Sequence, residues 1–325
     1  MLLSVIIPTY NRAAFLAPCV ASVRACGVPA EIVVVDDGST DDTAERVKDL
    51  GDVVYVRQAN GGPAPARNNG VAHSRGRFLA FLDSDDSWRP GVVPRLLDAL
   101  QKHPEVDVAF AETLVGNPTD GFKPLTPIVG EGTFDEIPCR RPAPGLRLLD
   151  REPFFVRMVK RNLVFLGSTV VRREAFDRLG GFDPGLFGGE DYEFVLRLAE
   201  RGPYAYVDEP LAYYLKHPGT ISDNHDRMDR EYALVMQKVL EKCPGLSAAH
   251  RELVRRRRRT LMYYLGYNSY DRGDYPEARR RLRALFREFR PDAASLAVWA
   301  ACQLPAGVLG RLRRLKQSLS GARPA

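Results

Sequence analysis

Apolar runs and amphipathic stretches alternate along the first 110 residues of the chain. Five short runs rich in Val, Ile, Leu and Phe have the length and composition of buried strands: residues 2–8, 31–35, 53–56, 78–82 and 106–110. The stretches between them repeat apolar residues at helical spacing, and we expect Asn11 to cap the first helix and Ser39 or Thr40 the second. This alternation is typical of an α/β protein with a mostly parallel sheet and helices on both faces.

The pattern changes twice further along the chain. Residues 113–150 are rich in Pro and Gly and show no clear period, so we predict a long loop there that is suited to act as a lid or as an acceptor-facing insertion. Helical and short strand signals then continue to about residue 225, with strands expected at 204–207 and 211–215. Beyond it, helices are expected at 228–242, 247–271, 276–288, 292–302 and 306–319. The sequence therefore predicts a first domain over 1–225 and a C-terminal α-helical region over 226–325.

Composition places the chain among ordinary globular proteins. Of its 325 residues, 45% are hydrophobic and 27% are charged, which excludes a collagen, a disulfide-rich mini-protein and a wholly disordered chain. The net charge of +6 is unevenly divided: residues 1–225 hold 25 Lys and Arg against 31 Asp and Glu, whereas residues 226–325 hold 22 against 10. An acidic first part and a strongly basic second part indicate that the two have different partners.

The cysteines and the N-terminus favour a reducing compartment. The five cysteines are odd in number and none form a CxxC pair, so we expect free thiols rather than a disulfide framework or a zinc site. The first residues lack the basic start of a signal peptide, and no stretch reaches the roughly 18–20 apolar residues that span a bilayer. We expect a cytoplasmic protein that is able to touch the membrane from that side.

Acidic residues follow the fourth expected strand directly. Asp83-Ser84-Asp85-Asp86 lies at a strand-to-loop junction, where ligands of α/β sheets bind. Carboxylates two residues apart can converge on Mg²⁺ or Mn²⁺, which take oxygen ligands from protein and substrate phosphates. A solvated acidic turn is the alternative, but the position directly after a buried strand favours the site.

Other polar motifs occupy equivalent places. Asp37, after the second strand, offers a carboxylate to a base N–H, although a turn and helix cap would use the same residues. The loop at 60–62 precedes a helix N-terminus that favours phosphate, and Arg67 on that helix can pair with a diphosphate or with a site carboxylate. This loop matches neither GxGxxG nor the P-loop pattern, which disfavours a dehydrogenase and a P-loop NTPase.

Two later positions add candidate chemistry. Glu190 and Asp191 begin an amphipathic helix behind two glycines, where a carboxylate can act as general base or simply favour the helix dipole. His217 lies in a polar loop, where its imidazole can ligate a metal or serve only to order the loop.

Together these motifs resemble those of one family. They are, in order, SVIIPTYNR at 4–12, VVDDGSTD at 34–41, NGG at 60–62 with ARN at 66–68, FLDSDDSW at 81–88 and GED at 189–191. Each motif is weak alone, but five in this order are specific. The sequence is similar to family 2 glycosyltransferases with the GT-A fold. The resemblance covers about residues 1–225 and leaves the basic region outside it.

The resemblance implies an inverting enzyme that uses a nucleotide-diphosphate sugar, often a UDP sugar, with Mg²⁺ or Mn²⁺. By the same resemblance, Pro8, Thr9 and Tyr10 lie beside the nucleoside, and Asp37 pairs with the base. Arg67 is then expected to meet charge on the leaving diphosphate.

The remaining site residues follow from the same resemblance. Asp83 and Asp85 match the DxD motif, with Asp85 expected to coordinate the metal and Asp83 to lie near the ribose or diphosphate as a further metal candidate. Asp191 matches the catalytic base, and Glu190 is a second, less certain catalytic candidate. His217 matches a loop that closes over the diphosphate in several members, and it is expected to contact the metal or the diphosphate.

The basic region admits three interpretations. It carries five consecutive arginines at 255–259 and an apolar stripe at Leu304, Val308, Leu309, Leu312, Leu315 and Leu319. Contact with anionic lipid at the inner face of the cell membrane is favoured, and a helical bundle packed on the catalytic domain is next. Nucleic-acid binding is disfavoured because no recognised module is present.

The leading hypothesis is therefore a metal-dependent glycosyltransferase that acts on a glycan or lipid-linked acceptor in surface polysaccharide synthesis. The rivals are a non-catalytic protein that binds a nucleotide or glycan, and a nucleotidyltransferase.

Overall fold

One mixed β-sheet forms the centre of the molecule. The computed structural model describes residues 2–124, 134–217, 225–304 and 308. Over these residues the sheet contains β1 (Leu3–Thr9), β2 (Ala30–Asp36), β3 (Val54–Arg57), β4 (Phe78–Phe81), β5 (Ser87–Trp88), β6 (Val108–Asn117), β7 (Gly121–Pro124), β8 (Cys139–Ala143), β9 (Leu146–Leu149), β10 (Thr169–Arg172) and β11 (Tyr204–Leu215). The order is β3-β2-β1-β4-β10-β6-β11-β9-β8, with β5 on β11 and β7 on β6.

The first half of the sheet is parallel, as the alternating pattern predicts. β1 pairs in parallel with β2 and β4, and β2 pairs in parallel with β3. Beyond β4 the sheet becomes mixed, because β10 runs antiparallel to both β4 and β6, while β6 and β11 are parallel. Mixed sheets of this kind are common among large α/β folds.

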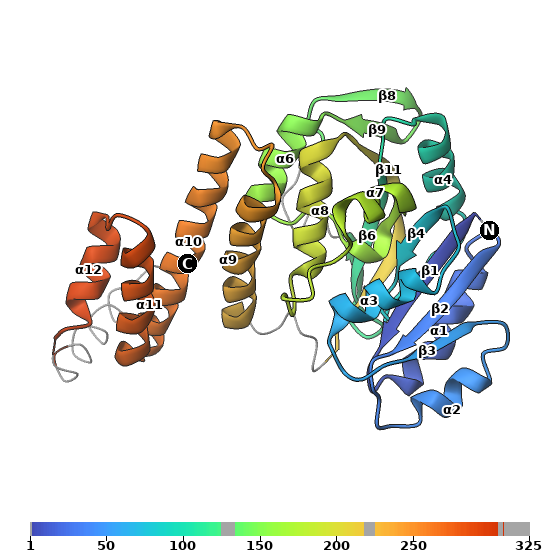
Figure 1. Ribbon diagram of the computed structural model, residues 1–325, viewed down its shortest axis with the longest axis horizontal. Coiled ribbons are helices and arrows are strands. Elements are labelled where there is room, and N and C mark those ends of the chain that lie inside the picture. The colour runs from blue at the N-terminus through green and yellow to red at the C-terminus, as the bar shows by residue number, and fades with distance from the viewer. Residues whose placement is uncertain (1, 125–133, 218–224, 305–307, 309–325) are drawn as a thin grey trace.

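The helices cover both faces of the sheet (Figure 1). One face carries α1 (Ala13–Arg24), α2 (Thr43–Lys48) and α4 (Val93–Lys102). The other carries α3 (Pro63–Ala72), α6 (Arg151–Lys160), α7 (Arg173–Leu179) and α8 (Glu190–Arg201). Side chains of a strand alternate between the two cores, so Ile6 packs with α3 and α8 whereas Val5 and Ile7 pack with α1.

The long loop predicted over 113–150 is wrong for most of that segment. β6 extends to Asn117 and turns back through β7, and β8 and β9 form a hairpin at the sheet edge. Residues 125–133 lie outside the described part. β8 is exposed and carries Arg140, Arg141 and Pro142, the residue types that protect an edge strand from further pairing. An exposed edge strand lacks the alternation of apolar and polar residues that marks a half-buried strand. The sequence of β8 therefore resembles that of a loop.

Two smaller expectations also differ from the structure. The strands expected at 204–207 and 211–215 are a single strand, β11, which is irregular around Pro210 because proline donates no ladder hydrogen bond. Neither Asn11 nor Ser39 caps a helix. Instead the Asn11 side-chain oxygen accepts from Thr40 N at 2.8 Å, and the Ser39 hydroxyl accepts from Asn11 N at 3.0 Å. These bonds join the loops after β1 and β2.

The C-terminal helices divide into two groups. α9 (His225–Lys242) and α10 (Ala248–Arg272) contribute Val235, Met236, Val239 and Val254 to the same core as α6 and α8. α11 (Tyr275–Glu288) and α12 (Ala293–Ala301) form a separate small core with the second half of α10. In Figure 1 they lie on the far side of α10 from the sheet. The helix expected at 306–319 lies almost wholly outside the described residues.

Ion pairs join the basic helices to the rest of the molecule. Lys242 on α9 lies 2.8 Å from Asp183. Burial alone would raise the pKa of Asp183, but the ammonium group of Lys242 holds this pKa at about 2. Arg281 on α11 binds Asp226 on α9 through both oxygens and holds the pKa of that carboxyl well below its usual range. Of the arginines at 255–259, Arg258 pairs with Glu288 and Arg259 with Asp292. Much of this positive charge is therefore neutralised within the bundle.

Within the described residues, none of the helices combines the length and the apolar character that a membrane crossing requires.

Candidate functional site

The polar motifs converge because β1, β2 and β4 end at the same edge of the sheet. In the parallel register Thr9 lies beside Asp36, and Ile6 lies beside Phe81. The residues that follow these strands are therefore neighbours in space, as expected at the carboxyl edge of a parallel sheet.

A cavity of about 960 Å³ opens at this edge. Nine of the ten site residues proposed from sequence line it: Pro8, Thr9, Tyr10, Asp37, Arg67, Asp83, Asp85, Glu190 and Asp191. The tenth, His217, reaches the site through its contact with Asp85. The volume lies near the upper end of the roughly 300–1,000 Å³ that ligand pockets occupy, so there is room for a large ligand or for two.

A buried guanidinium group links the two halves of this cavity. Arg67 is 4% exposed and donates to Asp83 at 2.6 Å and to Glu190 at 2.5 Å. Burial alone would lower the pKa of Arg67, but the charges of Asp83 and Glu190 raise it above its ordinary value, so the group stays protonated. The sequence allows Arg67 to pair either with site carboxylates or with a diphosphate. In the structure Arg67 binds the carboxylates, and its contact with a diphosphate stays a prediction.

Glu190 and Asp191 differ sharply in their surroundings. Glu190 is buried, and its second oxygen accepts from Gly188 N at 2.9 Å and Gly189 N at 3.0 Å. Asp191 is partly exposed to the cavity and accepts from Tyr192 N at 2.7 Å. Burial and then the adjacent charge of Glu190 raise the pKa of Asp191 to about 6. Glu190 is thus held in place by three donors, whereas Asp191 is partly exposed and has a raised pKa, which suits a general base.

Asp85 and His217 form the part of the site that best suits a metal. His217 Nε2 lies 2.9 Å from Asp85 Oδ2, and its ring stacks on Phe15 with centroids 5.4 Å apart. Arg12 Nε lies 3.6 Å from the same oxygen. Within the described residues no three Asp, Glu, His or Cys side chains converge as a ready metal site. Since Mg²⁺ and Mn²⁺ bind one or two protein carboxylates and take further ligands from phosphate, Asp85 fits such an ion, and the His217 imidazole beside it suits Mn²⁺ better than Mg²⁺.

Two neighbouring carboxylates stabilise the loops of the site. Asp37 accepts from Gln58 at 2.8 Å, from Gly61 N at 2.9 Å and from Gly62 N at 2.7 Å, so it orders the loop before α3. Asp86 is buried and accepts from Leu215 N at 3.0 Å, two residues before His217. Burial, followed by the charges of Asp83 and Asp85, raises the pKa of Asp86. This contact ties the acidic loop to the strand end that bears the histidine.

Sequence reasoning missed the apolar wall of the cavity. This wall consists of Asn162, Val164, Phe165, Phe187, Tyr214, Met228 and Tyr232, from four separate segments. Met228 and Tyr232 belong to an apolar stripe on α9 that looks, in sequence, like any core-facing helix. Only the fold shows that one end of this stripe faces a cavity.

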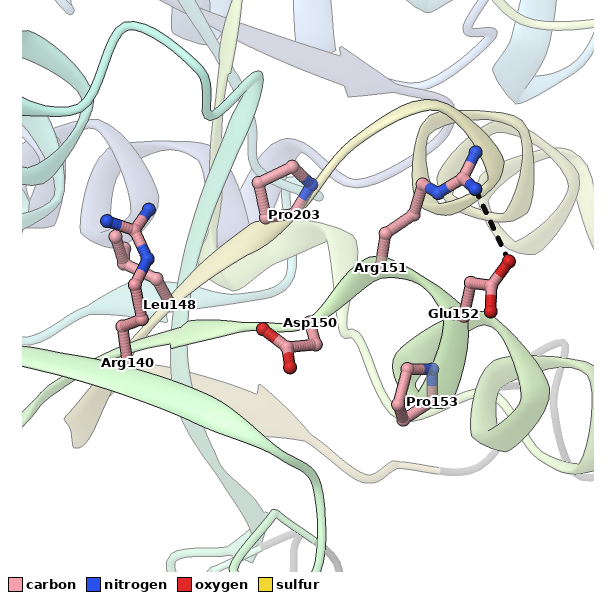
Figure 2. Close-up of a pocket in the computed structure, with 7 residues that line it drawn as sticks. All are labelled: Arg140, Leu148, Asp150, Arg151, Glu152, Pro153 and Pro203. Carbon is pink, nitrogen blue, oxygen red and sulfur yellow. Dashed lines mark ion pairs between the residues drawn. The ribbon is translucent and has the colours of Figure 1, made fainter.

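A second cavity, of about 420 Å³, lies near β8 and the start of α6 (Figure 2). Its two arginines already have carboxylate partners, because Arg140 binds Glu105 and Arg151 lies 3.5 Å from Glu152. It shares no residue with the larger cavity, which holds all the predicted chemistry.

Comparison with known proteins gives the family of the chain. The model of the family described as Glycosyl transferase family 2 matches residues 4–180. The succinoglycan biosynthesis protein ExoU of Rhizobium meliloti is 30% identical over 270 residues, which cover 79% of this chain and 74% of that protein.

Solved structures resemble the whole fold at low sequence identity. Residues 1–349 of S. aureus TarS in complex with UDP-GlcNAc align with a TM-score of 0.66 and 19% identity, covering 96% of this chain and 88% of that one. The mannosyltransferase PcManGT of Pyrobaculum calidifontis in complex with GDP-Man and Mn²⁺ aligns with a TM-score of 0.54 and 18% identity, covering 92% and 78%. These likenesses show the GT-A fold, including its helical C-terminal region.

Removal of the buried guanidinium should destabilise the protein in a pH-dependent way. Arg67→Ala leaves Asp83 and the buried Glu190 without their shared cation, and breaking a buried pair costs about 3–5 kcal/mol. Protonation relieves a stranded carboxylate, so the loss of unfolding free energy should be larger at pH 8 than at pH 5. Urea denaturation at both pH values measures it.

The matched control is Arg46→Ala, which removes an exposed pair with Asp42 and should cost less than about 1 kcal/mol. An Arg67→Ala loss that is as small as the control, or equal at both pH values, contradicts the bridging role.

Proposed function

The chain belongs to glycosyl transferase family 2, so it is a glycosyltransferase, and we propose that it transfers a sugar from a UDP-linked donor to a glycan or lipid-linked acceptor. One observation carries this proposal: a single cavity holds the DxD carboxylates at one strand end and a carboxylate with a raised pKa at the start of α8. The relative in succinoglycan biosynthesis supports a role in polysaccharide biosynthesis, which we propose to be that of a surface polysaccharide.

The donor nucleotide is proposed to bind along the ends of β1 and β2. Pro8, Thr9 and Tyr10 line this end of the cavity, and Tyr10 is 47% exposed, so its ring is available to a nucleoside. Asp37 has two oxygens with several acceptor positions, so it can take a base N–H beside its existing bonds. The similar TarS structure contains UDP-GlcNAc, which supports a UDP sugar.

Mg²⁺ or Mn²⁺ is proposed to bind at Asp85 and His217, with Asp83 beside them. A divalent ion there supplies positive charge against the leaving diphosphate. The Mn²⁺ of the similar mannosyltransferase supports this assignment. Arg67 fixes Asp83, and Asp86 fixes the strand end that carries His217, so the chain itself orients the ligands.

Asp191 is proposed to be the general base of an inverting transfer. It takes the proton of an acceptor hydroxyl while that oxygen forms a bond to the anomeric carbon. The bond from this carbon to the diphosphate oxygen breaks on the opposite face, and the electron pair leaves with the diphosphate. Glu190 takes no part in proton transfer in this scheme, because its hydrogen bonds to Arg67, Gly188 and Gly189 serve to position Asp191.

The two rival functions explain less of the site. A non-catalytic binding protein gives no reason for a base with a pKa near the working pH. A nucleotidyltransferase would use the metal carboxylates but leave Asp191 and the apolar wall without a role.

We further propose that α11 and α12 rest on an anionic membrane surface. Arg283 and Arg287 are exposed on one side of α11, and Arg279 on that side donates to Cys302 O at the end of α12. Leu304 and Val308, just beyond α12, are 43% and 44% exposed. Exposed arginines beside exposed apolar side chains suit lipid head groups. The rest of the predicted apolar stripe lies outside the described residues.

Donor binding should depend on metal through Asp85. In a thermal-shift panel of UDP, GDP and dTDP with Mn²⁺, a ligand at a hundredfold excess over Kd stabilises the native state by about 2.7 kcal/mol and raises Tm. We expect UDP to give the largest shift, and Asp85→Ala to remove the Mn²⁺-dependent part. The control Asp98→Ala removes a half-exposed carboxylate on α4, and this variant should keep the Mn²⁺-dependent part of the thermal shift. If none of the three nucleotides binds in the presence of metal, the proposed donor class is wrong.

Transfer should require ionised Asp191. Asp191→Asn keeps the shape of the side chain but removes the base, so kcat should fall by about 10²–10⁴-fold while the UDP thermal shift remains. In the wild type, kcat/KM should rise with pH through about 6 and level off above it, because only the carboxylate form accepts a proton. A pH–rate profile measures this. A profile that is flat between about pH 5 and 7 would exclude Asp191 as the base.

Membrane binding should depend on the exposed arginines of this face. Each arginine near an anionic surface contributes about 1 kcal/mol. Replacing Arg283 and Arg287 of α11 by Ala, together with Arg290, which is exposed two residues beyond the end of this helix, should therefore weaken binding to phosphatidylserine vesicles by on the order of 100-fold. Co-sedimentation measures it. Replacing Arg46, Arg75 and Arg140 by Ala removes the same charge from the catalytic domain and should have little effect. Equal losses in the two variants would mean that no particular face is used.

A further inference from the structure

Helix α9 reaches into the active-site cavity although it lies beyond the segment that matches the family. The match ends at residue 180, and α9 begins at His225. Met228 and Tyr232 line the cavity and are four residues apart, so they lie on one side of the helix. Val235 continues this side one turn later and is fully buried in the shared core. The outer part of this side therefore faces the cavity, and the inner part anchors the helix.

α9 packs directly on the turn that presents the base. Gly189 has φ of +138°, and a Cβ atom there would lie 3.2 Å from Val235 Cγ2 and 3.5 Å from Glu231 Cβ. A side chain at this position would displace either the turn or the helix. This close approach fixes the position of Tyr232 relative to Asp191, because Asp191 is only two residues after Gly189.

Tyr232 itself is held beside the base. Its ring packs edge to face on Tyr192 at 5.1 Å, and the Tyr192 hydroxyl is fixed by donating to Met158 O at 2.5 Å. Tyr232 and Asp191 line the same cavity, and burial and then the charge of Asp191 raise the pKa of Tyr232, so its hydroxyl stays protonated. A rigid aromatic ring with a polar tip thus stands at the point where an acceptor hydroxyl must arrive.

A second aromatic pair completes this end of the cavity. Phe165 precedes β10, Tyr214 is near the end of β11, and their rings lie 5.1 Å apart at 32°. Asn162 brings an amide to the same wall. These residues are separate from Pro8, Thr9, Tyr10 and Asp37, which line the nucleotide end of the cavity.

We propose that Met228 and Tyr232 of α9, with Phe165 and Tyr214, form the acceptor subsite, and that the acceptor presents a sugar ring there. This inference rests on the proposed transferase function and adds the class of the second substrate. A sugar ring has an apolar C–H face, which suits aromatic rings, and a rim of hydroxyls, which suits Tyr hydroxyls and an amide. A lipid tail would need a continuous apolar channel without these polar groups.

The test separates acceptor binding from donor binding. The donor is the nucleotide sugar that raises Tm most, supplied with Mn²⁺, and the acceptors are methyl glycosides of glucose, galactose, mannose and N-acetylglucosamine. Tyr232→Ala should raise the KM for the glycoside by at least about tenfold, while the KM for the donor stays within about twofold. Tyr232→Phe keeps the ring and should change the glycoside KM by less than about threefold.

Two further variants protect the result. Met228→Ala should also raise the glycoside KM, and it covers the case in which Tyr232→Ala fails to fold. Tyr264→Ala removes an equally large ring that is 48% exposed on α10, and it should change neither KM.

Each unfavourable result has its own meaning. If the wild type turns over no nucleotide sugar with any acceptor, the proposed function fails and the subsite falls with it. If it turns over the donor but transfers to none of the glycosides, or transfers to a polyprenyl phosphate instead, only the sugar subsite is overturned. Equal rises of both KM values in Tyr232→Ala would assign Tyr232 to the donor site and overturn the proposal as well.

Discussion

The geometry of the site depends on one guanidinium group. Arg67 joins Asp83, at the end of a central strand, to Glu190, at the start of a helix more than a hundred residues later. Neither of the backbone segments concerned is bonded to the other through the sheet, so this buried bridge sets the distance between them. A buried charge offsets its desolvation only when its partners are well placed, and here both carboxylates lie within 2.6 Å of the guanidinium.

The bridge also explains why two adjacent carboxylates play different parts. One oxygen of Glu190 accepts from Arg67 and the other accepts from two backbone N–H groups, so this side chain is fixed. Asp191 receives less compensation and stands next to that fixed charge, and its pKa rises to about 6. A carboxylate held in place for structural reasons thereby raises the pKa of its neighbour, which suits the general base proposed for Asp191. The glycine at 189 suits this arrangement, because its φ of +138° is one that residues with a side chain rarely adopt and a Cβ atom there would lie only 3.2 Å from Val235 on α9.

The parallel half of the fold and most of the site were predictable because each buried strand carries its polar motif at its end. The pairing of those motifs was not predictable in detail: Asp83 and Glu190 could not be matched to Arg67 from sequence, since contacts between distant segments leave no local pattern. The β8–β9 hairpin was missed because an exposed edge strand has no alternating pattern. Tyr232 was missed because a stripe that faces a cavity and one that faces a core obey the same spacing.

The division of charge along the chain acquires a more specific meaning from the structure. The acidic first part contains the carboxylates of the cavity, two of which are paired with the guanidinium group of Arg67. In the basic second part, ion pairs hold the helices to one another and hold α9 to the sheet domain. The cations of these pairs are Lys242, Arg281, Arg258 and Arg259. Much of the positive charge in this region therefore has a structural use, and Arg283 and Arg287 on α11 are among the described arginines that stay exposed. α9 contributes both to this charged seam and to the wall of the cavity, so the first helix of the basic region is built into the part of the molecule that carries the site.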